Sequence, residues 1–155
     1  MKKIAQDEAP TRFGTLYPEP YHLPCLARKR WRLGAAAGLT RFGVNLCRLS
    51  PGAWSSQRHW HSKDDEFVYV LEGEVVLVTD EGDETLRAGD CVGFRAGDGD
   101  GHHLQNRSDR EVVLLEIGTN DPEGTAEYPD IDLRSVTGSY FHKDGTPYPP
   151  LVRRA

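Results

Sequence analysis

Apolar and polar residues alternate in short runs through the middle of the chain, between Leu39 and Ile117. Successive side chains of a β-strand point to opposite faces, so this period of two predicts strands with one buried face. Glycine and aspartate interrupt the runs at intervals typical of an all-β sandwich or barrel. The pattern predicts these strands: Phe42–Leu49, Gln57–His61, Glu66–Glu72, Glu74–Thr79, Glu84–Arg87, Cys91–Phe94, His102–Asn106 and Glu111–Ile117.

The segments on either side of this region are richer in turn-forming residues. Four prolines fall within residues 1–38, which predicts an extended N-terminal arm with one short strand between Tyr21 and Leu33. Proline, glycine and aspartate return after Gly118, so residues 119–155 are predicted to form a C-terminal arm that packs on the barrel or on a neighbouring subunit. We therefore predict one barrel domain over residues 39–118 between two arms.

Charge and composition exclude several classes of partner. The 155 residues carry a net charge of −5, and a chain of this length can bury a core without disulfides or metal staples. The densest basic group runs from Arg28 to Arg32 beside Trp31, and we interpret it as a solvated face rather than a nucleic-acid surface. No apolar run approaches the ~20 residues of a membrane helix. Nucleic acid and membrane are therefore not expected partners.

The cysteines and the N-terminus indicate the compartment. The residues after Met1 carry two lysines but no apolar stretch, so they do not read as a secretion signal. The cysteines at 25, 47 and 91 are odd in number and have no C-x-x-C spacing. Three reduced thiols in a cytoplasmic protein are the expected result.

Histidine spacing supplies the candidate chemistry. His59 and His61 share one face of a predicted strand, and Glu66 opens the next with the same inward parity as Val68. His102 follows about forty residues later, with His103 on the opposite face as the alternative third histidine. Imidazoles with one carboxylate suit Zn, Cu, Fe, Ni or Mn. The absence of cysteine from the set argues against a closed structural zinc site.

The order of these residues resembles the two motifs of the cupin superfamily. The first motif matches from His59-Trp60-His61 through Glu66 to Gly73, although the gap from Gly52 to His59 is one residue longer than usual. The second begins at Gly89 and ends at Gly101-His102 and Asn106, but Arg95 stands in place of a proline and the loop to His102 is two residues longer. The resemblance covers about half of the chain.

The resemblance implies a fold and a ligand set. Cupins are double-stranded β-helix barrels of jelly-roll type, so an all-β barrel is expected here. By the same resemblance His59, His61, Glu66 and His102 would project inward to hold one divalent metal ion, with Mn, Fe, Zn and Ni as candidates. The whole chain is also similar to small, uncharacterised bacterial cupins described as sugar-phosphate-isomerase-like.

Three functions fit these residues. The first is a metalloenzyme acting on a small polar metabolite, of the sugar or sugar-phosphate isomerase type. The alternatives are an iron- or manganese-dependent dioxygenase and a non-catalytic barrel that binds or senses a small ligand. Expected pocket-lining residues are Gln57, Val68 and Asn106.

The sequence identifies no dedicated acid–base pair and no single anion-binding residue. Glu66, Tyr69, Tyr140 and His142 are the candidates for proton transfer. Arg48, Arg58 and Arg95 could each bind an anionic substrate.

The predicted strand at Glu66–Glu72 also indicates an assembly. Its alternation places Phe67, Tyr69 and Leu71 on the outward face. An apolar outer face needs a cover, and a second barrel would provide one. A homodimer is therefore expected.

Overall fold

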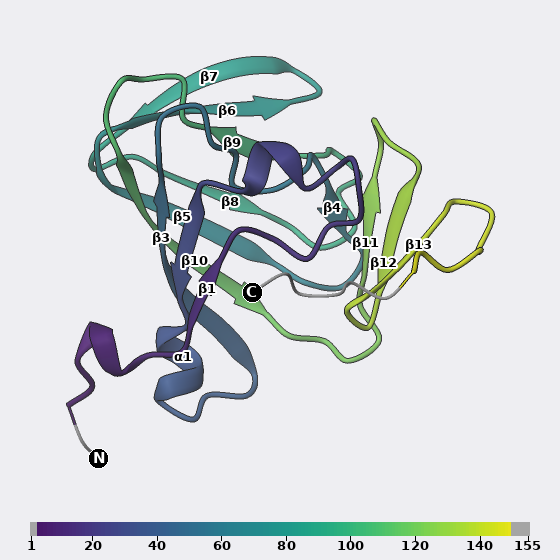
Figure 1. Ribbon diagram of the computed structural model, residues 1–155, viewed down its shortest axis with the longest axis horizontal. Coiled ribbons are helices and arrows are strands. Elements are labelled where there is room, and N and C mark those ends of the chain that lie inside the picture. The colour runs from purple at the N-terminus through teal and green to yellow at the C-terminus, as the bar shows by residue number, and fades with distance from the viewer. Residues whose placement is uncertain (1–2, 150–155) are drawn as a thin grey trace.

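The computed structural model describes residues 3–149, which fold into three antiparallel sheets with little helix (Figure 1). The sheets have the strand orders β1-β2-β3-β10-β5-β8, β7-β6-β9 and β13-β12-β11-β4. The short helices are η1 (Gln6–Glu8), η2 (Leu23–Cys25) and α1 (Leu33–Ala36). The strands are β1 (Thr11–Phe13), β2 (Arg28–Trp31), β3 (Phe42–Leu49), β4 (Trp60–His61), β5 (Glu66–Glu72), β6 (Glu74–Thr79), β7 (Gly82–Arg87), β8 (Cys91–Phe94), β9 (His103–Gln105), β10 (Val112–Thr119), β11 (Thr125–Tyr128), β12 (Leu133–Val136) and β13 (Ser139–Phe141).

The main core lies between the six-stranded and the three-stranded sheet. Alternation along β5 shows how this core forms: Val68 and Val70 are buried, whereas their neighbours Phe67 and Tyr69 are exposed. Aliphatic side chains from β3, β6, β7, β9 and β10 join the two valines in one buried cluster. The prediction of an all-β fold of the jelly-roll type is confirmed.

Four strands have the predicted limits, namely β3, β5, β6 and β8, and the other four differ at their ends. The largest difference is β4, which was expected to begin at Gln57 but begins at Trp60. Before Trp60, His59 makes only an isolated bridge with His102, and the carbonyls of Ser56 and Gln57 bond to side chains instead of a ladder. Ser56 O faces Nδ1 of His103 at 3.0 Å, and Gln57 O faces Nδ1 of His59 at 2.9 Å.

Both flanking segments contain strands that pair with the central region. β2 falls within the predicted range and pairs with β3, so β1 and β2 widen the six-stranded sheet. The C-terminal segment was predicted without strands, but β11 pairs with β4 and continues into β12 and β13 (Figure 1). A second buried cluster, which includes Tyr17, Tyr128 and Leu133, packs both flanks together. The boundaries at residues 38 and 118 stay predictions.

The three cysteines are free thiols: Cys25 and Cys47 are buried and Cys91 is exposed. Burial raises the pKa of Cys25 and of Cys47, so both favour the neutral thiol. Within residues 3–149 no helix is long and apolar enough to cross a membrane.

Candidate metal centre

Three predicted ligands converge at one point. Nε2 of His59 lies 3.1 Å from Nε2 of His61, and Oε2 of Glu66 lies 3.8 Å from the first nitrogen and 3.5 Å from the second. One ligand atom from each residue lies within 4.8 Å of the others. The geometry therefore groups His59, His61 and Glu66 as a candidate metal site.

His102 lies against the same group. Its Nε2 is 2.9 Å from Oε2 of Glu66, and reciprocal backbone hydrogen bonds of 3.1 and 2.9 Å join it to His59. Its ring stacks on Phe94 at a centroid distance of 3.5 Å. His103 instead faces the carbonyl of Ser56 and the side chain of Gln105. Of the two adjacent histidines, His102 is the one that faces Glu66.

Hydrogen bonding fixes the protonation of this cluster. The carbonyl of Gln57 can only accept, so Nδ1 of His59 carries a proton and Nε2 keeps a lone pair directed at the cluster. Burial lowers the pKa of His59 to about 3, which holds the ring neutral. Burial also raises the pKa of Glu66, but the hydrogen bonds with His102 and His61 outweigh it and hold the pKa well below its ordinary value. Glu66 is therefore ionised.

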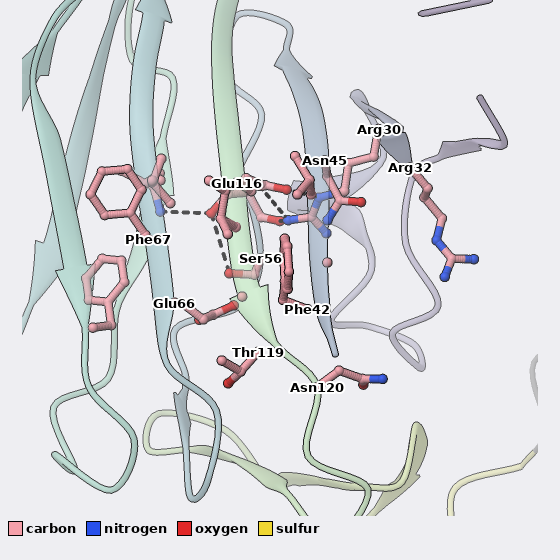
Figure 2. A pocket seen from close by; sticks show the side chains of 18 of the residues that line it. Arg30, Arg32, Phe42, Asn45, Ser56, Glu66, Phe67, Glu116, Thr119 and Asn120 are labelled. Carbon is pink, nitrogen blue, oxygen red and sulfur yellow. Dashed lines mark hydrogen bonds and ion pairs between the residues drawn. The ribbon is translucent and has the colours of Figure 1, made fainter. Parts of the chain in front are cut away.

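The cluster forms part of the wall of a cavity of about 490 Å³. Glu66, His59 and His102 line it, together with residues of β2, β3 and β10. Arg30 crosses this lining and makes two bonds to Glu116, with Nε–Oε2 at 2.6 Å and Nη2–Oε1 at 2.7 Å (Figure 2). Because these polar groups line the cavity together with apolar side chains such as Val68 and Phe94, it is suited to a small polar ligand.

A second cavity of about 260 Å³ also reaches the cluster, through His61 and His102. Its lining is strongly acidic, with Arg95 as the one cationic side chain among the described lining residues. The acidic residues are Asp64, Glu81, Glu84, Asp98 and Asp100. The two cavities therefore share His102 but differ in charge.

Comparison with known proteins identifies the family. The Cupin domain family matches residues 45–118. The crystal structure of a sugar phosphate isomerase from a cupin superfamily, from Silicibacter pomeroyi, is 43% identical to this chain with a TM-score of 0.88. That match covers 96% of this chain and 97% of the other. The chain is a cupin.

Two further solved structures extend the likeness, whereas no match was found among curated proteins. A candidate sugar phosphate isomerase from Acidithiobacillus ferrooxidans is 30% identical to this cupin, with a TM-score of 0.68 and 74% of each chain covered. The polyketide cyclase RemF from Streptomyces resistomycificus is 21% identical with a TM-score of 0.63, over 78% of this chain and 80% of the other. The similarity to RemF shows the fold alone.

The donor set of this cupin fits a divalent cation. Within residues 3–149 the contacts of the Glu66 carboxylate are to imidazoles, and no lysine or arginine neutralises it. The lone pair on Nε2 of His59 faces a second ring nitrogen and this carboxylate. An imidazole lone pair beside an ionised carboxylate suits a positive ion that accepts nitrogen and oxygen ligands.

The expected pocket-lining residues take different places. Val68 lines the larger cavity. Gln57 is not among the lining residues, because it precedes β4 and its Nε2 donates to the carbonyl of Tyr21. Asn106 is not among them either. It is buried and its Nδ2 donates to the carbonyls of Leu49 and Arg110, so it supports a turn.

The candidates for proton transfer outside the cluster do not line either cavity. Tyr69 points outward on β5, and Tyr140 packs in the second buried cluster. His142 pairs with Asp132 at 2.7 Å. Glu116 is a cavity carboxylate that the sequence analysis missed.

The arginines of the larger cavity were also missed. The group from Arg28 to Arg32 was expected to be a solvated face, but Arg28 is buried and Arg30 is half-buried. Side chains alternate along β2, so Arg28 and Arg30 share one face whereas Lys29 lies on the other. The expected anion-binding residues lie elsewhere: Arg48 pairs with Glu111, and Arg58 pairs with Asp80 and Asp130.

Proposed function

We propose that this cupin is a metal-dependent enzyme that isomerises a small polar metabolite of the sugar or sugar-phosphate class. The observation that carries the proposal is the convergence of His59, His61 and Glu66 at one point, with His59 and Glu66 in the wall of the 490 Å³ cavity. The similarity over 96% of the chain to a protein called a sugar phosphate isomerase supports the reaction class.

The metal site proposed here consists of His59, His61, Glu66 and His102. Mn, Fe, Zn and Ni all accept this mixture of imidazole and carboxylate ligands. When bound, a divalent ion supplies a Lewis acid that polarises a substrate carbonyl or hydroxyl. The lone pair on Nε2 of His59 is already free to bind the ion, because the proton of this ring lies on Nδ1, which donates to Gln57 O.

Glu116 is the group that we propose to move the substrate proton. A proton-transferring isomerase needs a base within hydrogen-bond reach of its substrate. Glu116 lies on β10 directly beside Val68 of β5, and both residues line the cavity. Arg30 holds both carboxylate oxygens of Glu116 and so fixes their orientation.

The first test of this proposal is metal content. Elemental analysis of untagged protein purified without added metal should find about one divalent ion per chain. The variant His59→Ala/His61→Ala should lose it, whereas the control His142→Ala should retain it because His142 pairs with Asp132 outside the cluster. Wild-type protein that holds no metal after loading and desalting would overturn the metalloenzyme.

The second test is turnover. Metal-loaded protein should incorporate deuterium from D₂O into a sugar or sugar phosphate during isomerisation, as followed by NMR. Glu116→Gln should bind metal but lose this exchange. Metal-loaded wild-type protein that is stabilised by such compounds without exchange or product would be a binding barrel and not an isomerase.

We also propose that two copies associate through the outward face of β5. Phe67, Tyr69 and Leu71 are 38%, 36% and 42% exposed there. A second copy would remove this apolar surface from water. Light scattering should give twice the 17.3 kDa of one chain, and the variant Leu71→Lys should lower that mass. A 17.3 kDa species at high micromolar concentration would contradict the dimer.

The cytoplasm is the compartment that we propose. Its support is the burial of the free thiols of Cys25 and Cys47, which suits a reducing environment. Fractionation of the native host should recover the protein with cytoplasmic markers.

A further inference from the structure

Arg30 and Arg32 reach the larger cavity from the same face of one strand. Arg30 lies in β2 and Arg32 follows its last residue, so their separation by two positions directs both side chains to one side. Both line the cavity. Lys29 and Trp31 occupy the opposite face, where the lysine ammonium lies 4.2 Å from the centroid of the tryptophan ring.

The two arginines differ in what they bind. Arg30 has its guanidinium engaged by both oxygens of Glu116. The exposed side chain of Arg32 has no hydrogen-bond or ion-pair partner among residues 3–149, and Figure 2 shows it standing apart from the Arg30–Glu116 pair. The backbone N–H of Arg32 donates to the carbonyl of Pro10 at 2.9 Å, which anchors the residue. Its guanidinium donors are therefore available to a ligand.

Strand register places Arg32 across the cavity from the metal centre. β5, β10, β3 and β2 are neighbours in the sheet, with Glu116 paired to Val68 on one side and to Asn45 on the other. Arg32 follows the last β2–β3 pair and so reaches the level of Asn45. Three strand spacings separate β5 from β2, which is about 14 Å between backbones. Glu66 and Arg32 both line this one cavity, so a metabolite held in it would have the metal centre at one end and Arg32 at the other.

Charge favours an anion at this end. Among the lining residues two arginines oppose two glutamates, so the larger cavity is close to neutral without metal. A divalent ion at the cluster would add two positive charges. The smaller cavity carries five carboxylates against Arg95 and repels anions. The neutral polar side chains of Thr40, Asn45 and Asn120 also line this cavity.

We propose that Arg32 binds the terminal oxyanion, a phosphate or a carboxylate, of the metabolite held in the larger cavity. The guanidinium fork matches both groups with two parallel hydrogen bonds. The inference rests on the proposed function in one respect, namely that the other end of the metabolite lies at the metal centre. It narrows the substrate class to small metabolites with an anionic end.

The test titrates metal-free protein with inorganic phosphate and, separately, with acetate at constant ionic strength. NMR of ¹⁵N-labelled arginine side chains should show one Nε signal that shifts and saturates, and that is missing from Arg32→Gln. Binding by Arg32→Gln should be weaker by about tenfold or more, because charge-assisted hydrogen bonds are lost. Arg32→Lys should retain part of the affinity. The matched control Arg95→Gln removes an exposed arginine from the acidic cavity and should bind as wild type.

Each outcome of the titration decides the proposal. Tighter binding of phosphate assigns a phosphate ester, and tighter binding of acetate assigns a carboxylate. Equal responses of wild type, Arg32→Gln and Arg95→Gln would mean an adventitious ion only, and an absence of saturable binding would equally overturn the role of Arg32. Because the protein in this titration carries no metal, its failure is distinct from a failure of metal binding or turnover.

Discussion

The two cavities of this cupin reach the same histidine cluster with opposite electrostatic character. Both are lined by His102, but the larger adds Glu66 and His59 whereas the smaller adds His61. The larger pairs its buried charges, as Arg30 and Glu116 show. The smaller leaves carboxylates such as Glu81 and Glu84 exposed. One cluster of candidate ligands therefore faces a nearly neutral cavity on one side and an acidic cavity on the other.

The two cavities also differ in how their charged side chains are paired. Arg30 and Glu116 lie on strands 86 residues apart in sequence and hold each other at 2.6 and 2.7 Å. Burial lowers the pKa of Arg30, but the neighbouring Glu116 raises it by more, so the guanidinium keeps its charge. Arg95 lies 3.7 Å from Asp98 and is largely exposed, so solvent screens that pair. The larger cavity consequently contains the shorter and more buried ion pair of the two.

The largest effect is expected from removing the carboxylate of Glu66, which lies against His59, His61 and His102. Glu66→Gln keeps the size of the side chain but loses its charge. Metal affinity should fall by well over ~100-fold, since outer partners of a ligand alone cost 10–100-fold. Competition against a fluorescent chelator measures this loss, with Glu84→Gln in the acidic cavity as the matched control. Equal affinities of Glu66→Gln and wild type would remove Glu66 from the ligand set.

A second substitution tests whether Asn106, which lines neither cavity, contributes to stability and not to metal binding. Asn106 is 1% exposed and its amide and carbonyl bond to Leu49, Arg110 and Ser108. Asn106→Ala removes these hydrogen bonds, leaves the buried carbonyl of Leu49 without this donor and should lower the free energy of unfolding by about 2 to 3 kcal/mol. Urea denaturation measures it. The folded variant should still bind metal with wild-type stoichiometry, and loss of metal by a folded protein would assign Asn106 to the site.

A third substitution removes the charge balance of the larger cavity. Arg30→Met leaves Glu116 half-buried without its cation and should cost about 2 kcal/mol of unfolding free energy. The double variant Arg30→Met/Glu116→Gln should recover part of that loss, because no unpaired charge remains. Denaturation of the four proteins forms a double-mutant cycle. Strict additivity would show that the two side chains do not stabilise each other.

The smallest effect is expected from a substitution in the acidic cavity. Glu84→Gln removes one of several like charges from an exposed strand. Its change in unfolding free energy should stay within about 0.5 kcal/mol, because exposed sites without special partners contribute little. Thermal denaturation at low and high salt measures it. A loss comparable with that of Arg30→Met would show that the acidic cavity is as highly organised as the larger one.

Local sequence pattern sufficed where each strand has one buried face. β5 and β6 begin and end where alternation and flanking turns place them, because burial of Val68, Val70 and Val75 fixes the register. β11 to β13 were missed because their pairing depends on β4 and on aromatic packing between the chain ends. Such contacts leave no periodic signal in a segment of three or four residues.

The candidate site divides in the same way. His59, His61 and Glu66 were found because the spacing of these residue types follows strand geometry and the motifs of one superfamily. Glu116 and Arg30 were missed because their pairing joins distant strands, and a charged residue in a mixed run resembles an ordinary surface charge. Asn106 shares the parity of His102, but turn hydrogen bonds determine where its side chain lies.

Strand β2 lies outside the part of the chain that the family model matches. The family-matched stretch, residues 45–118, encodes His59, His61 and Glu66, whereas Arg30 and Arg32 are encoded upstream of it. If the proposed roles hold, substitutions or recombination in the upstream stretch would change which ligand is bound while the proposed metal ligands stay unaltered. A chimera that exchanges residues 1–38 between two such proteins would be a direct way to transfer selectivity.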